Sequence, residues 1–208
     1  MNRENGTVDR TKSWGQDYRF SLIDRAGTWL NVRQIRRRVR GFRGKAVADI
    51  GCGFQAVFAR SILDDVARAT LVDLALAEDL KQDAKVTAIE GELPEVLERV
   101  QSQSLDVVVC NNVLEHLWQP SVALQHVRRM LKPGGLAYLN VPSWQGKPFL
   151  ELAAFRLGLT SPSEIDDHKA YYNRRELWRL VVSSGFKPSR VECHSHKFGL
   201  NTFAVCTV

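Results

Sequence analysis

The stretch Ala46–Ala56, A-V-A-D-I-G-C-G-F-Q-A, decides the fold of this chain. Residues 46–50 suit a buried strand and run directly into a glycine turn, and residues with helical character follow up to Leu63. Gly51 permits a tight turn, and Gly53 lets a ligand approach the backbone. Because the free amides at a helix start favour anionic or hydrogen-bond-accepting groups, this order of elements predicts a nucleotide-type binding site.

The length and composition of the chain are typical of one ordinary globular domain. With 208 residues, it can bury roughly 70% of its unfolded surface, but it is too short for two comfortable domains. Hydrophobic residues make up 44% and charged residues 25%, which excludes the disordered and membrane-embedded classes. No apolar run approaches the roughly 20 residues of a bilayer span, and the polar start lacks a secretory apolar segment. We therefore expect a cytoplasmic protein without a transmembrane segment.

The four cysteines predict reduced thiols, because they show no C-x-x-C spacing and none of the density of a disulfide scaffold. Cys193 lies next to His194 and close to His196, a combination that could suggest a metal. On an extended strand, however, Cys193 faces away from both histidines. We therefore predict no metal site.

The net charge of +6 is concentrated in one segment. Between Asp24 and Asp49 there is no acid but eight cations, and without this segment the chain is slightly acidic. Thr28 is a predicted N-cap for a helix that ends at Gly41 and carries an apolar face. The cations form either the solvated face of that helix or a contact surface for phosphates, an anionic glycan or lipid headgroups. Aromatic residues are not interleaved there, so we expect no nucleic-acid partner.

Strand and helix patterns alternate along the rest of the chain. This alternation predicts an α/β fold, with a parallel sheet covered by helices on both faces and ligands at the carboxyl ends of the strands. The predicted strands are residues 46–50, 69–73, 85–89, 105–110, 136–141, 187–193 and 201–207, and the predicted helices after the first strand are 54–63, 94–101, 120–131 and 174–184.

Two cofactors compete for the glycine turn. The pattern G-x-G-x-x-A, with Asp73 placed 22 residues after Gly51, also suits a nicotinamide dinucleotide and hence an NAD(P)-dependent oxidoreductase. Asp49, however, precedes the turn at the buried end of the strand, where its charge would repel a pyrophosphate. A cofactor that carries an amino group and a sulfonium, without phosphate, suits that carboxylate better.

A set of motifs in the order and spacing found here resembles the class I S-adenosylmethionine-dependent methyltransferases, especially the type 11 group that includes quinone-biosynthesis enzymes. The resemblance covers roughly residues 46–141. It implies a Rossmann-like, seven-stranded, mostly parallel sheet whose last two strands form a C-terminal hairpin containing the antiparallel strand. The matching pieces are D-I-G-C-G at 49–53, V-D at 72–73, G-E-L-P at 91–94, L-D-V-V-V-C-N-N-V-L-E-H-L at 105–117 and L-K-P-G-G at 131–135.

The resemblance also implies roles for individual residues. Asp49 and the amides of the turn would hold the methionine end of S-adenosyl-L-methionine, Asp73 would accept from the ribose hydroxyls, and Glu92 would face the adenine amino group. The implied cofactor-binding residues are Asp49, Gly51, Cys52, Gly53, Asp73, Leu74, Glu92, Leu93, Asn111 and Asn112. Gln55 stands where family members commonly have a third glycine, which leaves a degenerate, non-catalytic protein that binds a partner as an alternative.

Methyl transfer from a sulfonium is an in-line displacement that mainly demands alignment, with S-adenosyl-L-homocysteine as the product. If the acceptor atom is a hydroxyl oxygen, a general base would accelerate the reaction. His116, which follows the fourth predicted strand, and His168, which follows the insert, are our candidates for the catalytic residues. Both also have a structural interpretation.

The sequence divides into an N-terminal, basic helical appendage at residues 1–45 and a methyltransferase domain at 46–208. The domain carries a substrate-capping insert at about 143–170, whose apolar residues suit a substrate lid, a dimer face or ordinary core packing. Combined with the basic helix, the insert suggests a small-molecule or glycan acceptor that is anionic or lipid-linked. A peripheral membrane contact and either a monomer or a homodimer are compatible with this interpretation.

Overall fold

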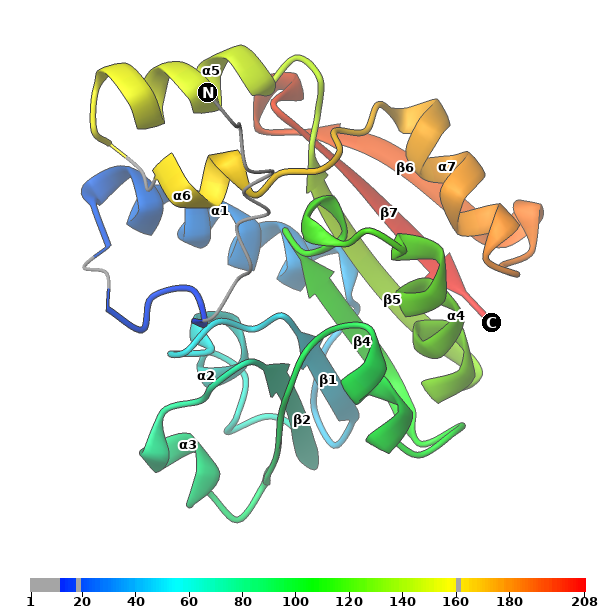
Figure 1. Ribbon diagram of the computed structural model, residues 1–208. Coiled ribbons are helices and arrows are strands. Elements are labelled where there is room, and N and C mark those ends of the chain that lie inside the picture. The colour runs from blue at the N-terminus through cyan, green and yellow to red at the C-terminus, as the bar shows by residue number, and fades with distance from the viewer. Residues whose placement is uncertain (1–11, 18–19, 160–161) are drawn as a thin grey trace, which may run out of the picture.

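The computed structural model describes residues 12–17, 20–159 and 162–208, and in it seven strands form one sheet (Figure 1). The strand order is β3-β2-β1-β4-β5-β7-β6. β7 pairs antiparallel with β5 and with β6, whereas the other pairs are parallel, which confirms the predicted C-terminal hairpin. The strands are β1 (Ala46–Ile50), β2 (Arg68–Asp73), β3 (Val86–Glu90), β4 (Leu105–Asn111), β5 (Leu131–Pro142), β6 (Val191–His196) and β7 (Asn201–Thr207).

Both faces of the sheet are buried, and all five residues of β1 are buried. Successive side chains of a strand point to opposite faces. Ala48 and Ile50 accordingly belong to an apolar cluster with α4 (Pro120–Met130) and α7 (Arg174–Ser183), while Val47 belongs to a second cluster with α1 (Leu22–Arg38) and α2 (Val57–Arg60). The sheet is therefore the middle layer of the molecule, and its helices lie on both sides (Figure 1).

α1 is one continuous helix, which corrects the prediction of a helix that begins at Thr28 and ends at Gly41. Ser21 is the N-cap, and its side chain and that of Asp24 form a reciprocal capping box. This box satisfies the helix start seven residues earlier than Thr28 would. Ile35 and Val39 are buried in the same cluster as Val47, so the helix packs on the sheet. The division of the chain between residues 45 and 46 stays a prediction.

Several predicted elements have different bounds in the structure. The strand predicted at 136–141 begins earlier, at Leu131. The helix after the glycine turn is only α2, because Ala56 before it adopts a left-handed conformation with φ of +42°. The helix predicted at 94–101 is a single 3-10 segment, Glu95–Arg99. The strand predicted at 187–193 begins later, at β6, because a 3-10 turn at Pro188–Arg190 precedes it.

The segment between β5 and α7 is helical and lies at one end of the molecule (Figure 1). It contains α5 (Lys147–Glu151), a π-helical segment (Leu152–Arg156) and α6 (Pro162–Asp166). Its exposed apolar side chains are Trp144, Phe149, Leu152, Phe155 and Leu157, which are 47–64% accessible. Among the described residues, no helix combines the length and apolar character of a bilayer-spanning segment.

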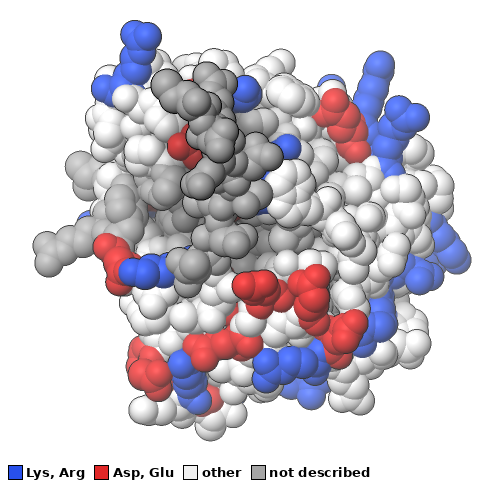
Figure 2. Space-filling view, viewed as in Figure 1, with Lys and Arg blue, Asp and Glu red and all other residues white. Residues whose placement is uncertain are grey.

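Two cations of the basic segment contact other parts of the described chain. Arg38 lies over the ring of Phe203 at 5.1 Å, and the Arg36 guanidinium donates to the carbonyl of Ser61. Both arginines therefore take part in the packing of α1. Figure 2 shows acidic and basic side chains on the visible face, with acidic ones gathered in the lower half, where Figure 1 places β2 and α3 (Glu78–Lys81).

Candidate functional site

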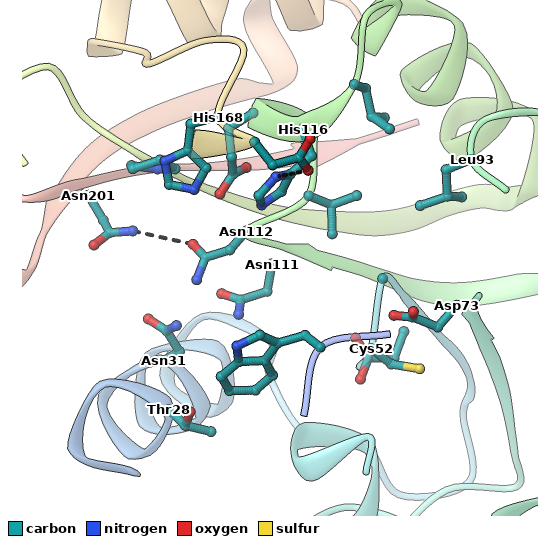
Figure 3. Close-up of a pocket in the computed structure, with 18 of the residues that line it drawn as sticks. Thr28, Asn31, Cys52, Asp73, Leu93, Asn111, Asn112, His116, His168 and Asn201 are labelled. Atoms are coloured by element: carbon teal, nitrogen blue, oxygen red, sulfur yellow. Dashed lines mark hydrogen bonds and ion pairs between the residues drawn. The ribbon is translucent and has the colours of Figure 1, made fainter. Parts of the chain in front are cut away.

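A cavity of about 1110 Å³ opens at the carboxyl ends of the parallel strands, where ligands bind in sheets of this kind. Segments that follow β1, β2, β3 and β4 supply one part of its wall, and α1 and the insert supply the rest. Figure 3 shows Cys52, Asp73 and Leu93 at one end of the cavity and Asn31 and Asn201 at the other. The predicted cofactor residues that line the cavity are Asp49, Gly51, Cys52, Asp73, Leu74, Glu92, Leu93, Asn111 and Asn112.

Gly53, the remaining predicted cofactor residue, acts through its backbone and is not part of the cavity wall. Its amide donates to Oδ2 of Asp73 at 2.7 Å. Oδ1 of Asp73 accepts from the Leu74 amide at 2.8 Å and from the Ser13 hydroxyl at 2.5 Å. Asp73 therefore ties the glycine turn to the end of β2, and Ser13 donates to it in the way that a ribose hydroxyl would.

The turn requires glycine at position 51. Its φ is +64°, which L-residues with side chains rarely adopt, and a Cβ there would lie 2.2 Å from Cγ2 of Val113. The turn is further fixed to β2 by a hydrogen bond from the Gly51 amide to the Val72 carbonyl at 2.7 Å. A glycine is therefore required where the turn passes Val113.

Asp49 is buried, and its Oδ2 has no hydrogen-bond partner in the structure. Burial, together with the nearby charge of Asp73, raises its pKa to about 8, against the lowering effect of a hydrogen bond from the Ala59 amide. We expected Asp49 to be an anion, but in the free protein its carboxyl group retains its proton at neutral pH. An orphaned carboxyl oxygen in the cavity wall fits a ligand that brings an ammonium group, as S-adenosylmethionine does.

Replacing Asp49 with asparagine is expected to stabilise the free protein and weaken cofactor binding. Between about pH 4 and pH 8 the carboxyl is protonated when folded but ionised when unfolded, so its contribution to the free energy of unfolding falls as pH rises. The stabilisation in Asp49→Asn should therefore be larger at pH 8 than at pH 5, as urea unfolding would measure. An equal effect at both pH values would contradict the raised pKa.

Asn111 and Asn112 are held by an amide network at the end of β4. Nδ2 of Asn140, a fully buried residue on β5, donates to Oδ1 of both at 3.0 Å. Nδ2 of Asn201 also lies 3.4 Å from Oδ1 of Asn112, as the dashed line in Figure 3 shows. Asn112 has a φ of +57°, a conformation that asparagine tolerates better than most residues. Buried neighbours thus fix both side chains beside the cavity.

His116 forms a pair with Asp167, which we considered together with His168 as an acceptor-side group but did not predict to be a partner of His116. Nδ1 of His116 lies 2.8 Å from Oδ2 of Asp167, and both side chains are at most 7% exposed. Burial opposes ionisation of Asp167, but hydrogen bonds from His116 and Lys169 outweigh it and lower its pKa to about 2. The ionised carboxylate of Asp167 accepts a hydrogen bond from Nδ1–H of His116, which leaves Nε2 of His116 as the basic atom. The structure thus orients His116 as a general base requires.

His168, the second predicted catalytic residue, lies beside His116, with ring centroids 4.8 Å apart (Figure 3). Its Nδ1 lies 3.1 Å from the hydroxyl of Tyr171, whose pKa burial raises to about 12. Tyr171 therefore keeps its proton and can donate it. The Glu115 carbonyl accepts from the amides of Lys169 and Ala170, which fixes this segment against the end of β4.

At the hairpin, His194 and His196 pack on Phe203, whereas Cys193 packs against the opposite core, as the alternation of side chains along a strand predicts. Glu115, His116 and His168 are the group in the described part of the chain whose ligand atoms lie close together, within 4.8 Å of one another. The absence of a bound metal stays a prediction.

The sequence did not predict which side chains from distant segments meet at the cavity. Asp167 was considered together with His168, but its contact with His116, 51 residues away in the chain, was not predicted. Asn140 and Lys197 were not predicted as site residues, because Asn140 lies within a core strand and Lys197 belongs to a turn that we did not assign. A polar residue inside an apolar strand was the available signal for Asn140, whereas no local pattern distinguishes Lys197.

Comparison with known proteins agrees with this geometry. A family model described as "Methyltransferase domain" matches residues 18–190. The ubiquinone biosynthesis O-methyltransferase of Klebsiella pneumoniae (strain 342) is 32% identical over 188 residues, which cover 86% of this chain and 76% of that protein. The enzyme of the same name from Escherichia coli O6:H1 is 28% identical over 201 residues, covering 91% and 82%.

Among solved structures, a SAM-dependent methyltransferase from Archaeoglobus fulgidus is similar in fold, with a TM-score of 0.63 and 15% identity over 86% of this chain and 94% of that one. The oxidoreductase alternative therefore has no support from the fold or the relatives. The orphaned oxygen of Asp49, the carboxylate of Asp73 and the narrow turn at Gly51 together fit S-adenosylmethionine. The chain belongs to the methyltransferase-domain family and is a class I S-adenosylmethionine-dependent methyltransferase of the quinone-biosynthesis-like type.

Proposed function

We propose that the protein methylates a hydroxyl oxygen of a small-molecule or glycan acceptor, with His116 as the general base. The pairing of His116 with the ionised Asp167 at the cavity wall carries this proposal. When bound, S-adenosylmethionine supplies an electrophilic methyl group. The chain's own residues orient the acceptor, exclude water and remove the hydroxyl proton, and positioning of this kind can lower a barrier by roughly 7–11 kcal/mol.

Each end of the site has a separate task in this mechanism. Asp49 and Asp73 would hold the amino acid and ribose ends of the cofactor, Glu92 and Leu93 the adenine, and Asn111 the region of the reacting methyl. His116 would accept the acceptor proton at Nε2, while Asp167 stabilises the resulting imidazolium. His168 lies close enough to contact the acceptor from the insert side.

The nature of the acceptor and the cellular setting extend the same proposal. Leu150, Ala153 and Ile165 of the insert line the cavity, which supports its role in capping the acceptor. The exposed apolar side chains on the outer face of the insert suit a lipid-linked acceptor or a second copy of the chain. We place the reaction in the cytoplasm, where bacterial cells make S-adenosylmethionine.

A calorimetric titration with S-adenosylhomocysteine, S-adenosylmethionine and NAD tests the cofactor part of the proposal. We expect micromolar binding of the first two ligands and none of NAD. Transfer of labelled methyl from S-adenosylmethionine to a panel of phenols, sugars and amines then tests the acceptor atom. Binding of NAD alone would overturn the proposal, and labelled amines without labelled hydroxyl compounds would overturn its assignment to oxygen.

A further inference from the structure

Lys197 is a cation in the wall of the cavity that the proposed mechanism does not use. It lies at the end of β6, and its Nζ is 3.7 Å from where a Cβ on Gly27 of α1 would be. Among the described residues, its ammonium has no ion pair and no hydrogen bond. A half-buried ammonium without a partner is unfavourable, because water can no longer solvate it fully. A ligand that brings a negative charge would remove this cost.

The backbone around Lys197 is strained in a way that points to a function. Lys197 and Phe198 have φ values of +51° and +58°, and Gly199 follows with +91°. For residues with side chains, each such conformation costs of order 1–3 kcal/mol, and strain of this kind gathers at functional sites. Hairpin turns commonly place such φ values on asparagine or glycine, whereas this turn places them on Lys197 and Phe198, at a cost in stability.

Contacts with the start of the insert hold this turn in place. The Ser143 hydroxyl donates to the Gly199 carbonyl at 2.5 Å, and the Ser143 amide donates to the Leu200 carbonyl at 3.0 Å. Gly146 packs so closely that a Cβ there would lie 2.2 Å from the Leu200 oxygen. The position of Lys197 is therefore fixed by its surroundings.

The polar groups near Lys197 come from α1 and β7. Thr28 and Asn31 project from α1 toward the end of the cavity where Asn201 lies, away from Asp73 (Figure 3). Asn31 is only 5% exposed, and its Oδ1 has no partner. Its amide can both donate and accept hydrogen bonds. This end of the cavity therefore offers a cation and uncommitted polar groups.

Carboxyl groups line much of the cavity, whereas its wall contains two lysines, Lys169 and Lys197. Asp49, Asp73 and Glu92 belong to the cofactor end in the proposed mechanism, and Glu95, Glu115, Asp166 and Asp167 also line the cavity. Asp24 lines it too, but its carboxylate accepts from the amide and hydroxyl of Ser21 at the start of α1. None of the eight cations from Arg25 to Lys45 lines the cavity. Lys169 pairs with Asp167 at 2.7 Å, so among the described residues Lys197 is the lysine of the cavity wall without an ion pair.

We propose that Lys197, with Thr28 and Asn31, forms a subsite for an anionic group of the acceptor, a carboxylate or a phosphate. The subsite selects acidic acceptors over neutral ones of the same shape. This inference rests on the proposed function, since it concerns the acceptor end of the same cavity. Burial lowers the pKa of Lys197 to about 8, so the ammonium is still charged at neutral pH and an anion would raise its pKa.

Binding of three small probes to the complex with S-adenosylhomocysteine tests the subsite. The probes are 3-hydroxybenzoate, 3-hydroxybenzamide and phenyl phosphate, and ligand-observed NMR gives their dissociation constants. The full-length wild-type protein should bind at least one of the two anions about tenfold more tightly than the amide, as a charge-assisted hydrogen bond would provide. Whichever anion is preferred identifies the acidic group. The subsite would be overturned if all three probes bound equally, or if none of the three bound.

Two variants and a matched control locate the preference. Lys197→Met should bind the anions no more tightly than the amide, whereas Lys197→Arg should retain the preference. Lys187→Met makes the same change at an exposed lysine and should behave as wild type. A preference that persists in Lys197→Met, with S-adenosylhomocysteine affinity intact, would overturn the subsite alone. A wild-type protein that fails to bind S-adenosylhomocysteine would overturn the proposed function, and the subsite with it.

Discussion

Replacing Asp73 with alanine is expected to weaken binding of S-adenosylhomocysteine by at least about 100-fold. The carboxylate would lose two charge-assisted hydrogen bonds to the ribose, worth about 1.5–3 kcal/mol each. It would also release the Gly53 amide, which it now holds at 2.7 Å, and so loosen the turn. Isothermal titration calorimetry at constant pH measures the change directly.

Asp79→Ala is the matched control for Asp73→Ala. Asp79 is an exposed acid on α3 that pairs with Arg60 and does not line the cavity. The control should bind S-adenosylhomocysteine within about twofold of wild type, since exposed ion pairs contribute little. Near wild-type affinity in Asp73→Ala would show that Asp73 does not contact the ribose.

Replacing His116 with glutamine is expected to lower kcat by about 10²–10⁴ for a hydroxyl acceptor, the usual contribution of a general base. Glutamine retains hydrogen-bonding capacity but cannot take up the proton. Asp167→Asn should also lower kcat, because an amide no longer fixes the Nδ1 proton of His116. Single-turnover methyl transfer under saturating cofactor separates this loss from slow product release.

Cofactor affinity distinguishes a chemical role of His116 from a structural one. His116→Gln should bind S-adenosylhomocysteine as wild type does, because His116 lies on the acceptor side of the cavity. His126→Gln, on α4 and outside the cavity, should retain both activity and binding. If His116→Gln retained full activity, deprotonation by His116 would not be part of the mechanism.

The sequence by itself determined the sheet, the glycine turn and the residues along the strand ends. Hydrophobic periodicity is a local signal, so the strands were predictable from it, and Asp49 stood out as an acid before the glycine turn. The antiparallel hairpin and the cofactor roles of Asp73 and Asn112 were implied by the resemblance to the methyltransferases. The helix boundaries were harder to predict, because capping by Ser21 and the left-handed conformation of Ala56 depend on side-chain hydrogen bonds and packing.

Only the tertiary structure decided which groups face each other across the cavity. The pairing of His116 with Asp167, the proton retained by Asp49 and the unpartnered ammonium of Lys197 all arise from burial beside segments that are distant in the chain. The sequence specifies which residue stands at each position, but the charge state and the partners of that residue depend on how far folding removes it from water. The sequence therefore identified the reaction class and the cofactor, and the packing of the insert and α1 around the sheet formed the part of the cavity where we propose that the acceptor binds.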